Sequence, residues 1–251
     1  MNNYTLLQWN IWYKENYKNV IKYLKQINAD IVTLQEVTQN SFEQNFVDVV
    51  EELKNKTNYN VYYKPAHYWY LNNKTKKFQG NAILSKFPFK RKSFVFVQNI
   101  NENNLDDYRT EGRVYVECDI ELNNSKSIIV GTTHLSYNHK FKESELKSKE
   151  ENRLLKAIAG HKNKFILSGD FNVDEDSRLI SELEQLLMNA GPNYSEKTWT
   201  TKPFDYNGFR ENNLNWRLDY VFSTPDINIV SAKILKTDYS DHLPIFVKFK
   251  L

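Results

Sequence analysis

Cysteine is almost missing from this sequence, and so are long apolar runs. Cys118 is the single cysteine among 251 residues, which excludes an internal disulfide and a zinc site built from several thiolates. No stretch approaches the roughly 18 apolar residues that a membrane-spanning helix requires. The first residues, MNNYTLLQWNIWYKEN, have neither the basic start nor the apolar core of a secretory signal. We therefore expect a cytoplasmic protein without stable membrane association.

Glycine and proline are also few, with 7 and 6 residues scattered along the chain. No linker rich in proline, glycine or serine divides the sequence, and no internal repeat occurs. Apolar residues make up 40% of the chain and charged residues 26%, which excludes a disordered chain. The length suits one large domain, so we expect residues 1–251 to form a single domain that acts as a monomer.

The charge balance permits nucleic acid as a partner without requiring it. The net charge is +3 and the isoelectric point is about 8.6. Lys74, Lys76 and Lys77 follow closely on the aromatic stretch HYWYL at 67–71. Basic residues interleaved with aromatics suit a phosphate-rich strand whose bases can stack. A solvated lysine-rich surface or a buried aromatic cluster explains the same segment.

Apolar spacing predicts helices and strands that alternate along the chain. Helices are expected at 17–27, 42–54, 143–159 and 176–190. Strands are expected at 4–11, 30–37, 60–64, 81–84, 93–98, 113–121, 127–134, 164–172, 217–222, 227–235 and 243–250. A strand-rich middle between helical flanks predicts two packed sheets with helices outside.

Several predicted strands end on polar side chains. In ILSGDFN, Asp170 and Asn172 share one face of the strand and Phe171 takes the other, because side chains two apart point the same way. A turn explains this stretch equally well, since Gly, Asp and Asn all favour turns. Polar residues at other predicted strand ends are Asn10, Glu36, His134 and the pair Asp241–His242. Active sites of α/β proteins lie beyond such strand ends.

These residue types restrict the chemistry. Asn, Asp and Glu are hard oxygen donors, and no cysteine accompanies them, which favours Mg²⁺ or Mn²⁺ over a thiolate-bound metal. The two histidines can stabilise negative charge or move protons. An oxygen-ligated metal beside imidazoles suits the cleavage of a phosphate ester, where charge on the phosphate oxygens must be stabilised.

Eight motifs occur in an order that resembles the endonuclease/exonuclease/phosphatase superfamily. They are QWN, LQEV, GNAILSKFP, EGRVYVECD, TTHLS, SGDFNV, NWRLDYVF and YSDHLP. The resemblance runs from residue 5 to residue 249, nearly the whole chain. It implies an α/β fold, a four-layer α/β sandwich in which two packed mixed β-sheets are flanked by helices. It also implies a metal-dependent phosphodiesterase, a hydrolase that acts on phosphoric ester bonds.

The resemblance further implies a metal site and its surroundings. Glu36 resembles the main ligand of Mg²⁺ or Mn²⁺, with Asn10 beside it and Asp241 as a further carboxylate of the metal site. Asn81 and Arg113 resemble residues that support or contact the substrate phosphate.

The catalytic residues implied by the resemblance lie in the later motifs. Asp170 resembles the residue that orients or deprotonates the attacking water, and Asn172 resembles a donor to the scissile phosphate. His242 resembles the histidine that stabilises the transition state, and Asp219 resembles the carboxylate that orients it. His134 matches the second active-site histidine.

The motifs favour DNA as the substrate. NWRLDYVF is similar to exonuclease III-type abasic endonucleases, in which the positions of Trp216 and Leu218 help to line the sugar pocket. That group usually has a tyrosine at the position of His134 and a lysine soon after its glutamate motif, whereas this sequence reads LQEVTQ. The set WN, LQEV, GDxN and SDH is most similar to 5′-tyrosyl-DNA phosphodiesterases.

We therefore expect a DNA endo- or exonuclease. The alternatives are a 5′-tyrosyl-DNA phosphodiesterase of DNA repair and, less favoured, a phospholipid or sphingomyelin phosphodiesterase. A scaffold that has kept the fold and lost the chemistry would lack at least one of the residues Glu36, Asp170, Asn172, Asp241 and His242, and all are present.

Overall fold

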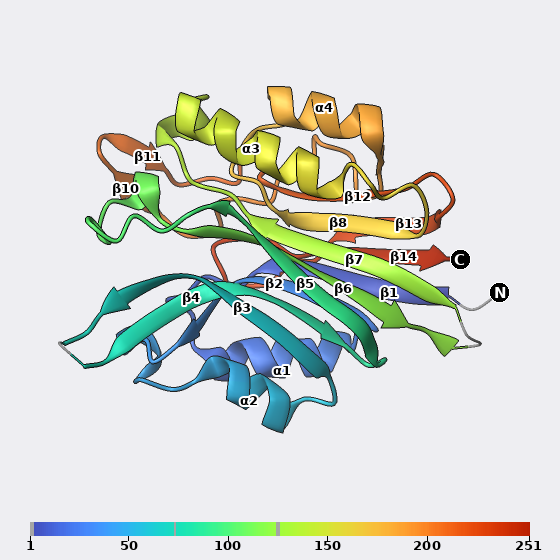
Figure 1. Ribbon diagram of the computed structural model, residues 1–251, viewed down its shortest axis with the longest axis horizontal. Coiled ribbons are helices and arrows are strands. Elements are labelled where there is room, and N and C mark those ends of the chain that lie inside the picture. The colour runs from blue at the N-terminus through green and yellow to red at the C-terminus, as the bar shows by residue number, and fades with distance from the viewer. Residues whose placement is uncertain (1–2, 73, 124–125) are drawn as a thin grey trace.

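Two six-stranded mixed sheets pack face to face and carry helices on their outer faces. The structure is a computed structural model that describes residues 3–72, 74–123 and 126–251. Helices α1 and α2 cover the first sheet and α3 and α4 cover the second, so that four layers follow one another (Figure 1). The helices are α1 (Tyr17–Ile27), α2 (Val49–Lys56), α3 (Glu145–Ile158) and α4 (Arg178–Leu186). The predicted four-layer α/β sandwich is confirmed.

The first sheet has the strand order β13-β14-β1-β2-β4-β3. Strands β1 and β2 are parallel, and the other neighbours in this sheet are antiparallel. Its strands are β1 (Asn3–Asn10), β2 (Ile31–Gln39), β3 (Asn60–Tyr70), β4 (Lys76–Ser85), β13 (Asn228–Ile234) and β14 (Ile245–Lys250).

The second sheet has the order β5-β6-β7-β8-β12-β9 and also contains one parallel pair, β7 with β8. Its strands are β5 (Phe89–Gln98), β6 (Arg113–Glu121), β7 (Ser127–His134), β8 (Phe165–Asp170), β9 (Met188–Asn189) and β12 (Asp219–Ser223). A separate hairpin consists of β10 (Phe204–Tyr206) and β11 (Phe209–Glu211). Each large sheet therefore has one parallel pair, whose two carboxyl ends lie next to each other.

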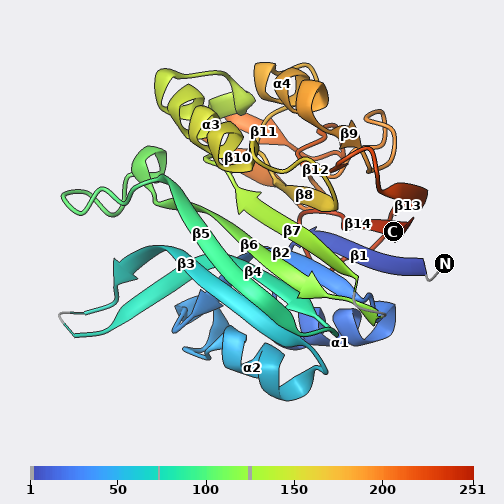
Figure 2. The same ribbon diagram turned by 45° about the vertical axis from the view of Figure 1, so that its right-hand side comes forward.

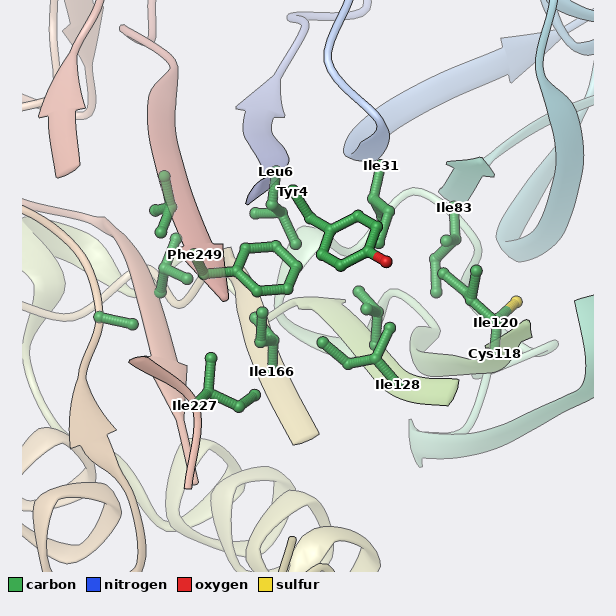
Figure 3. Close-up of a cluster of buried hydrophobic side chains, with 14 of the residues drawn as sticks. Tyr4, Leu6, Ile31, Ile83, Cys118, Ile120, Ile128, Ile166, Ile227 and Phe249 are labelled. Atoms are coloured by element: carbon green, nitrogen blue, oxygen red, sulfur yellow. The ribbon is translucent and has the colours of Figure 1, made fainter. Parts of the chain in front are cut away.

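An apolar core fills the space between the two sheets. Leu6 and Ile31 from the first sheet meet Ile128 and Ile166 from the second (Figure 3). All four are buried, and full burial of such a side chain stabilises the fold by about 1.5–3 kcal/mol. Cys118 lies in the same core, where burial raises the pKa of its thiol to about 12 and keeps it unreactive.

Several element bounds agree with the sequence pattern, but the helix expected at 42–54 is divided. Phe42–Gln44 form a short 3-10 turn, and Asn45 and Phe46 then adopt left-handed backbone conformations. Asp48 caps α2 by accepting hydrogen bonds from two backbone N–H groups of its first turn. The apolar periodicity could not show this interruption, because the exposed phenylalanines continued the pattern.

The helix expected at 176–190 is also shorter than its pattern. It ends at Leu186, because Met188 and Asn189 pair with β12 as an edge strand. Within the described ranges, no helix has both the length and the apolar character needed to cross a membrane.

Candidate active site

Polar residues from both sheets meet where the two parallel strand pairs end. Asn10 is the last residue of β1, and His134 and Asp170 end β7 and β8 and face each other in register. Glu36 lies in β2, and Asp219 opens β12 opposite Asp170. A cleft of about 600 Å³ opens here, and its floor includes Glu36, His134, Asp170, Asn172, Asp241 and His242.

The carboxylate of Asp170 is at the centre of this floor. Its Oδ2 atom accepts a hydrogen bond of 3.0 Å from Asn10 Nδ2 and lies 3.5 Å from His134 Nε2 and 3.6 Å from His242 Nε2. Its Oδ1 atom accepts from the backbone N–H of Asn172 at 2.9 Å. Burial raises the pKa of Asp170 to about 6, so the group is ionised at neutral pH yet can accept a proton.

His242 is held as a cation by acidic neighbours. Its Nδ1 atom donates to Asp219 Oδ2 at 2.8 Å, and Gln8 Nε2 donates to the other Asp219 oxygen at 2.7 Å. Burial alone would lower the pKa of His242, but the carboxylates of Asp219, Asp170 and Asp241 raise it well above its usual value. The ring therefore presents a protonated Nε2 toward Asp170.

His134 is held as a neutral ring. Burial, followed by the Arg113 cation, lowers its pKa well below the usual value. Asn172 Nδ2 lies 3.1 Å from His134 Nε2 and donates to the carbonyl oxygen of Leu135 at 2.9 Å. Since an amide nitrogen only donates, His134 Nε2 accepts and its contact with Asp170 is no ion pair. Both N–H groups of Asn172 are thus engaged within the protein, and its role as a donor to phosphate stays a prediction.

A β-bulge aims Glu36 into the cleft. Leu34 and Val37 both pack in the core between the first sheet and its helices, although strict alternation would place residues three apart on opposite faces. The register shifts between them, so that Gln35 and Glu36 together oppose Asn81 on β4. Glu36 has a φ of 61°, a left-handed conformation that is rare for a glutamate. Without this bulge its side chain would point into the helix layer.

Glu36 and Asp241 form an acidic side of the cleft. Glu36 accepts from Asn10 Nδ2 at 3.1 Å and from the backbone N–H of Tyr13 at 2.9 Å, while burial raises its pKa. Asp241 accepts from Trp199 Nε1 at 3.2 Å, and burial raises its pKa to about 6, opposed by the His242 cation. Two half-buried carboxylates that face one cleft favour a bound cation.

The donor atoms of the cleft suit Mg²⁺ or Mn²⁺. One candidate group is the predicted set of Asn10, Glu36 and Asp241, which offers oxygen donors only. A second is Asp170, Asp219 and His242, whose ligand atoms lie within 4.8 Å of one another. In the second group both Asp219 oxygens already accept hydrogen bonds, which favours an orienting role for Asp219. Both Glu36 oxygens accept hydrogen bonds as well, so these bonds do not separate the two groups. His242 is held as a cation, and a protonated imidazole cannot ligate a metal, so the oxygen donors of Asn10, Glu36 and Asp241 stay the predicted cation site.

The predicted substrate residues differ in their places. Arg113 lines the cleft and pairs with Glu111 at 2.7 Å. Asn81 is buried beside the Glu36 bulge, where its Nδ2 atom donates to a backbone carbonyl of β6 at 2.7 Å. Trp216 packs on Phe141 with ring centres 4.7 Å apart and lies outside the lining of the cleft. Its contact with substrate stays a prediction.

Aromatic side chains form much of the lining of the cleft, and most of them lie outside the motifs recognised in the sequence. One cluster of neighbouring rings in the lining consists of Tyr108, Tyr137, Phe204 and Tyr206. Further lining residues are Trp12, Tyr13, Lys14, Trp69 and Lys77. These residues come from loops and strands far apart in the sequence, so no local pattern groups them. Only the stretch HYWYL gave a signal.

The turn end of β3 and β4 forms one lip of the cleft and extends beyond α1 and α2 (Figure 2). We call Trp69, Tyr70, Lys76 and Lys77 the hairpin lip. Trp69 and Lys77 line the cleft, whereas Tyr70 and Lys76 pair at the next position and face the other side of the hairpin. Lys77 Nζ lies 4.8 Å from the Trp69 ring centre, and Lys76 Nζ lies 4.9 Å from that of Tyr70. Tyr70 is 57% exposed, whereas His67 is only 3% exposed. The HYWYL segment is therefore buried at its start and open at its end.

Comparison with known proteins agrees with this architecture. The family model described as "Endonuclease/Exonuclease/phosphatase family" matches residues 7–242. No curated protein sequence matches the chain. Among solved structures, an endonuclease/exonuclease/phosphatase from Beutenbergia cavernae has a TM-score of 0.75 at 17% identity, covering 100% of this chain and 72% of the other.

Two further structures of similar fold carry more specific descriptions. D. rerio TDP2 complexed with single strand DNA product has a TM-score of 0.71 at 16% identity, with 100% of both chains covered. A Bacteroides thetaiotaomicron mannosyl-6-phosphatase has a TM-score of 0.67 at 16% identity, covering 99% of this chain and 100% of the other. At such identities these likenesses show the fold alone. The family match spans most of the sequence, and the chain belongs to the endonuclease/exonuclease/phosphatase family.

Proposed function

We propose that this member of a phosphoesterase family is a Mg²⁺- or Mn²⁺-dependent phosphodiesterase that hydrolyses nucleic acid, with DNA favoured. The observation that carries the proposal is the Asp170 carboxylate placed between a neutral and a cationic imidazole. Its Oδ2 atom lies 3.5 Å from His134 Nε2 and 3.6 Å from His242 Nε2. A base and a cation side by side suit the attack of water on a phosphate ester.

The residues of the floor have different roles in this reaction. Asp170 orients the water and accepts its proton as the water oxygen bonds to phosphorus and the ester P–O bond breaks. The protonated Nε2 of His242, held in place by Asp219, stabilises the charge that develops on the phosphoryl oxygens. A divalent cation held by Asn10, Glu36 and Asp241 would polarise a phosphoryl oxygen when bound.

The walls of the cleft support a nucleic acid substrate. Aromatic rings in the lining can stack on bases, and Lys14 and Lys77 can contact phosphates. The TDP2 structure with a single-stranded DNA product adds a neighbour of the same fold, while the mannosyl-6-phosphatase shows that this fold also serves a phosphatase. The alternative we keep is a 5′-tyrosyl-DNA phosphodiesterase, on the motif pattern given above; a sphingomyelin phosphodiesterase is less favoured.

A substrate panel in Mg²⁺ tests the proposal. It compares single-stranded DNA, duplex DNA, an abasic duplex, a 5′-tyrosyl oligonucleotide, RNA and sphingomyelin, each with the native chain and with H242A. We expect cleavage of DNA by the native chain and its loss in H242A. Release of tyrosine that leaves an intact 5′-phosphate would establish the alternative, and cleavage of sphingomyelin alone would refute the nucleic acid substrate.

The hairpin lip allows a sharper test of substrate size. Trp69→Ala removes a ring of the hairpin lip that lines the cleft, without touching its floor. We expect it to raise KM for a long oligonucleotide by about tenfold, from the 1–3 kcal/mol typical of base stacking, and to leave hydrolysis of a small chromogenic diester unchanged. Val230→Ala, at an exposed position of β13, is the control. An equal KM for the oligonucleotide in both variants would exclude the hairpin lip from substrate binding.

We also propose that the chain acts as a monomer in the cytoplasm. Cys118 supports this setting, because a single unpaired thiol suits a reducing compartment. Light scattering of the purified protein tests the monomer, and a dimer mass would refute it. Fractionation of the source cells tests the compartment.

A further inference from the structure

Lys147 is a charged residue buried beneath the active site. It lies on α3 and is only 1% exposed, although lysine is rarely buried unless it is paired. Its Nζ atom donates to the carbonyl oxygens of Ser136 at 2.6 Å, Phe171 at 2.8 Å and Asn172 at 3.4 Å. One ammonium group thus binds the segment after β7 and the segment after β8.

These two segments carry the residues that frame Asp170. The pairing of β7 with β8 reaches His134 and Asp170, and the N–H of Leu135 then donates to the Asp170 carbonyl at 3.0 Å. Beyond this point the strands no longer form a regular ladder. The side chains of Asn172 and Lys147 join the two segments instead.

Glu150, one turn later on α3, also binds the segment after β7. It is 1% exposed, and its carboxylate accepts from the backbone N–H of Ser136 at 3.1 and 3.2 Å. Burial raises the pKa of Glu150, whereas the Lys147 cation acts against that rise. Lys147 and Glu150 therefore bind the carbonyl and the N–H of the same residue, two positions after His134. Exposed Lys149, between them in sequence, pairs with Glu145 on the outer face of the helix.

We propose that Lys147 and Glu150 are positioning residues that hold His134 and Asn172 against Asp170. This inference rests on the proposed function for its kinetic consequence only, because the position of His134 can be measured without substrate. Neither residue touches the cleft. Their effect passes through Ser136 and the segment after β8, and a displacement of about 1 Å there can cost about a hundredfold in rate.

The test uses the double variant K147M/E150Q, which removes the cation without leaving a buried carboxylate unpaired. The chain has five histidines, so imidazole proton–carbon correlation spectra of the metal-free protein are simple to assign with single histidine variants. We expect the His134 resonance to move in the double variant, while that of His242, held by Asp219 on another strand, stays in place. K149M, the same substitution on the exposed face of α3, is the control and should change neither.

Activity gives the second readout. In the double variant we expect kcat for a small chromogenic diester to fall by about a hundredfold, with KM changed by less than about threefold, because the substrate contacts remain. K147R keeps the charge and should move the His134 resonance in the same direction by a smaller amount. A His134 resonance at its native position in both variants would overturn the inference. Since the spectra need no substrate, a failure of the proposed function would leave this result readable.

Discussion

The hydrogen bond between Asp219 and His242 makes a sharp prediction for Asp219→Asn. The substitution keeps the shape of the side chain and removes its charge. Gln8 now donates to Asp219 through Nε2, and its Oε1 atom is buried without a hydrogen-bond partner among the described residues. Rotation of the Gln8 amide would present that oxygen to the new amide nitrogen, and the new amide oxygen could then accept from His242 Nδ1. We therefore expect the variant to fold with little loss of stability.

The same substitution should strongly impair catalysis, and the size of the fall in kcat can be estimated from the structure. His242 Nδ1 lies 2.8 Å from Asp219 Oδ2. Two unit charges about 4 Å apart attract by about 4 kcal/mol at an effective dielectric constant of about 20. Asp170 and Asp241 remain in the variant and also favour the His242 cation. We therefore take about 3 kcal/mol as the loss of stabilisation of the protonated ring in Asp219→Asn. Since about 1.4 kcal/mol corresponds to tenfold in rate, kcat should fall by about a hundredfold or more.

The assay is steady-state hydrolysis of a small chromogenic phosphodiester in Mg²⁺, together with the thermal midpoint of unfolding. Asp176→Asn, at an exposed aspartate, is the matched control and should leave both quantities unchanged. A D219N variant that folds and keeps kcat within about threefold of the native value would refute the assigned role of Asp219. A variant that unfolds would instead show that the Gln8 rearrangement does not occur.

Three further predictions address the metal, the backbone and pH. Glu36→Gln should abolish the rise in Tm that Mg²⁺ gives the native chain, and an equal rise would exclude Glu36 as a ligand. Gly169→Ala should lower Tm by at least about 6 °C, because φ is 152° and a Cβ atom would lie 2.1 Å from the Thr133 carbonyl oxygen; an unchanged Tm would contradict this contact. Burial lowers the pKa of His67, whose Nδ1 accepts from the Gly112 N–H. The free energy of unfolding should therefore fall as pH drops below about 6.5, because the unfolded chain then binds a proton that the folded chain does not. In His67→Gln, denaturant titration should show a smaller dependence of this free energy on pH.

The residues that follow β8 take the faces that alternation predicts, although the strand expected to reach residue 172 ends at Asp170 and Asn172 adopts a left-handed φ of 49°. Asp170 and Asn172 do line the cleft, and Phe171 packs on the other face with Tyr220 and Phe222. Gly169, however, does not end its strand as a turn would. It pairs in register with Thr133 and Tyr220, and its absent side chain allows the close approach of β7.

The aromatic walls illustrate what local patterns cannot show. Tyr108, Tyr137 and Tyr206 lie in three separate segments, yet their rings contact one another at 5.5–6.3 Å between centres. Trp216 carried a motif signal but lies outside the lining, whereas Trp199, which had none, lines the cleft. Only the packing of loops against each other determines which ring faces the substrate.

Glu36 and Lys147 show what strand alternation and helix periodicity alone cannot predict. Alternation would place Glu36 on the helix face, and only a bulge with a left-handed φ turns it into the cleft. Lys147 belongs to a helix so rich in charged residues that its sequence predicts a solvated surface. The structure instead buries its ammonium group, because backbone carbonyls from the segments after β7 and β8 converge on it and accept its hydrogen bonds. In both cases a locally unfavourable choice, strain in one and a buried cation in the other, is stabilised by distant groups. Such residues are therefore the first to examine when a structure places them beside a candidate site.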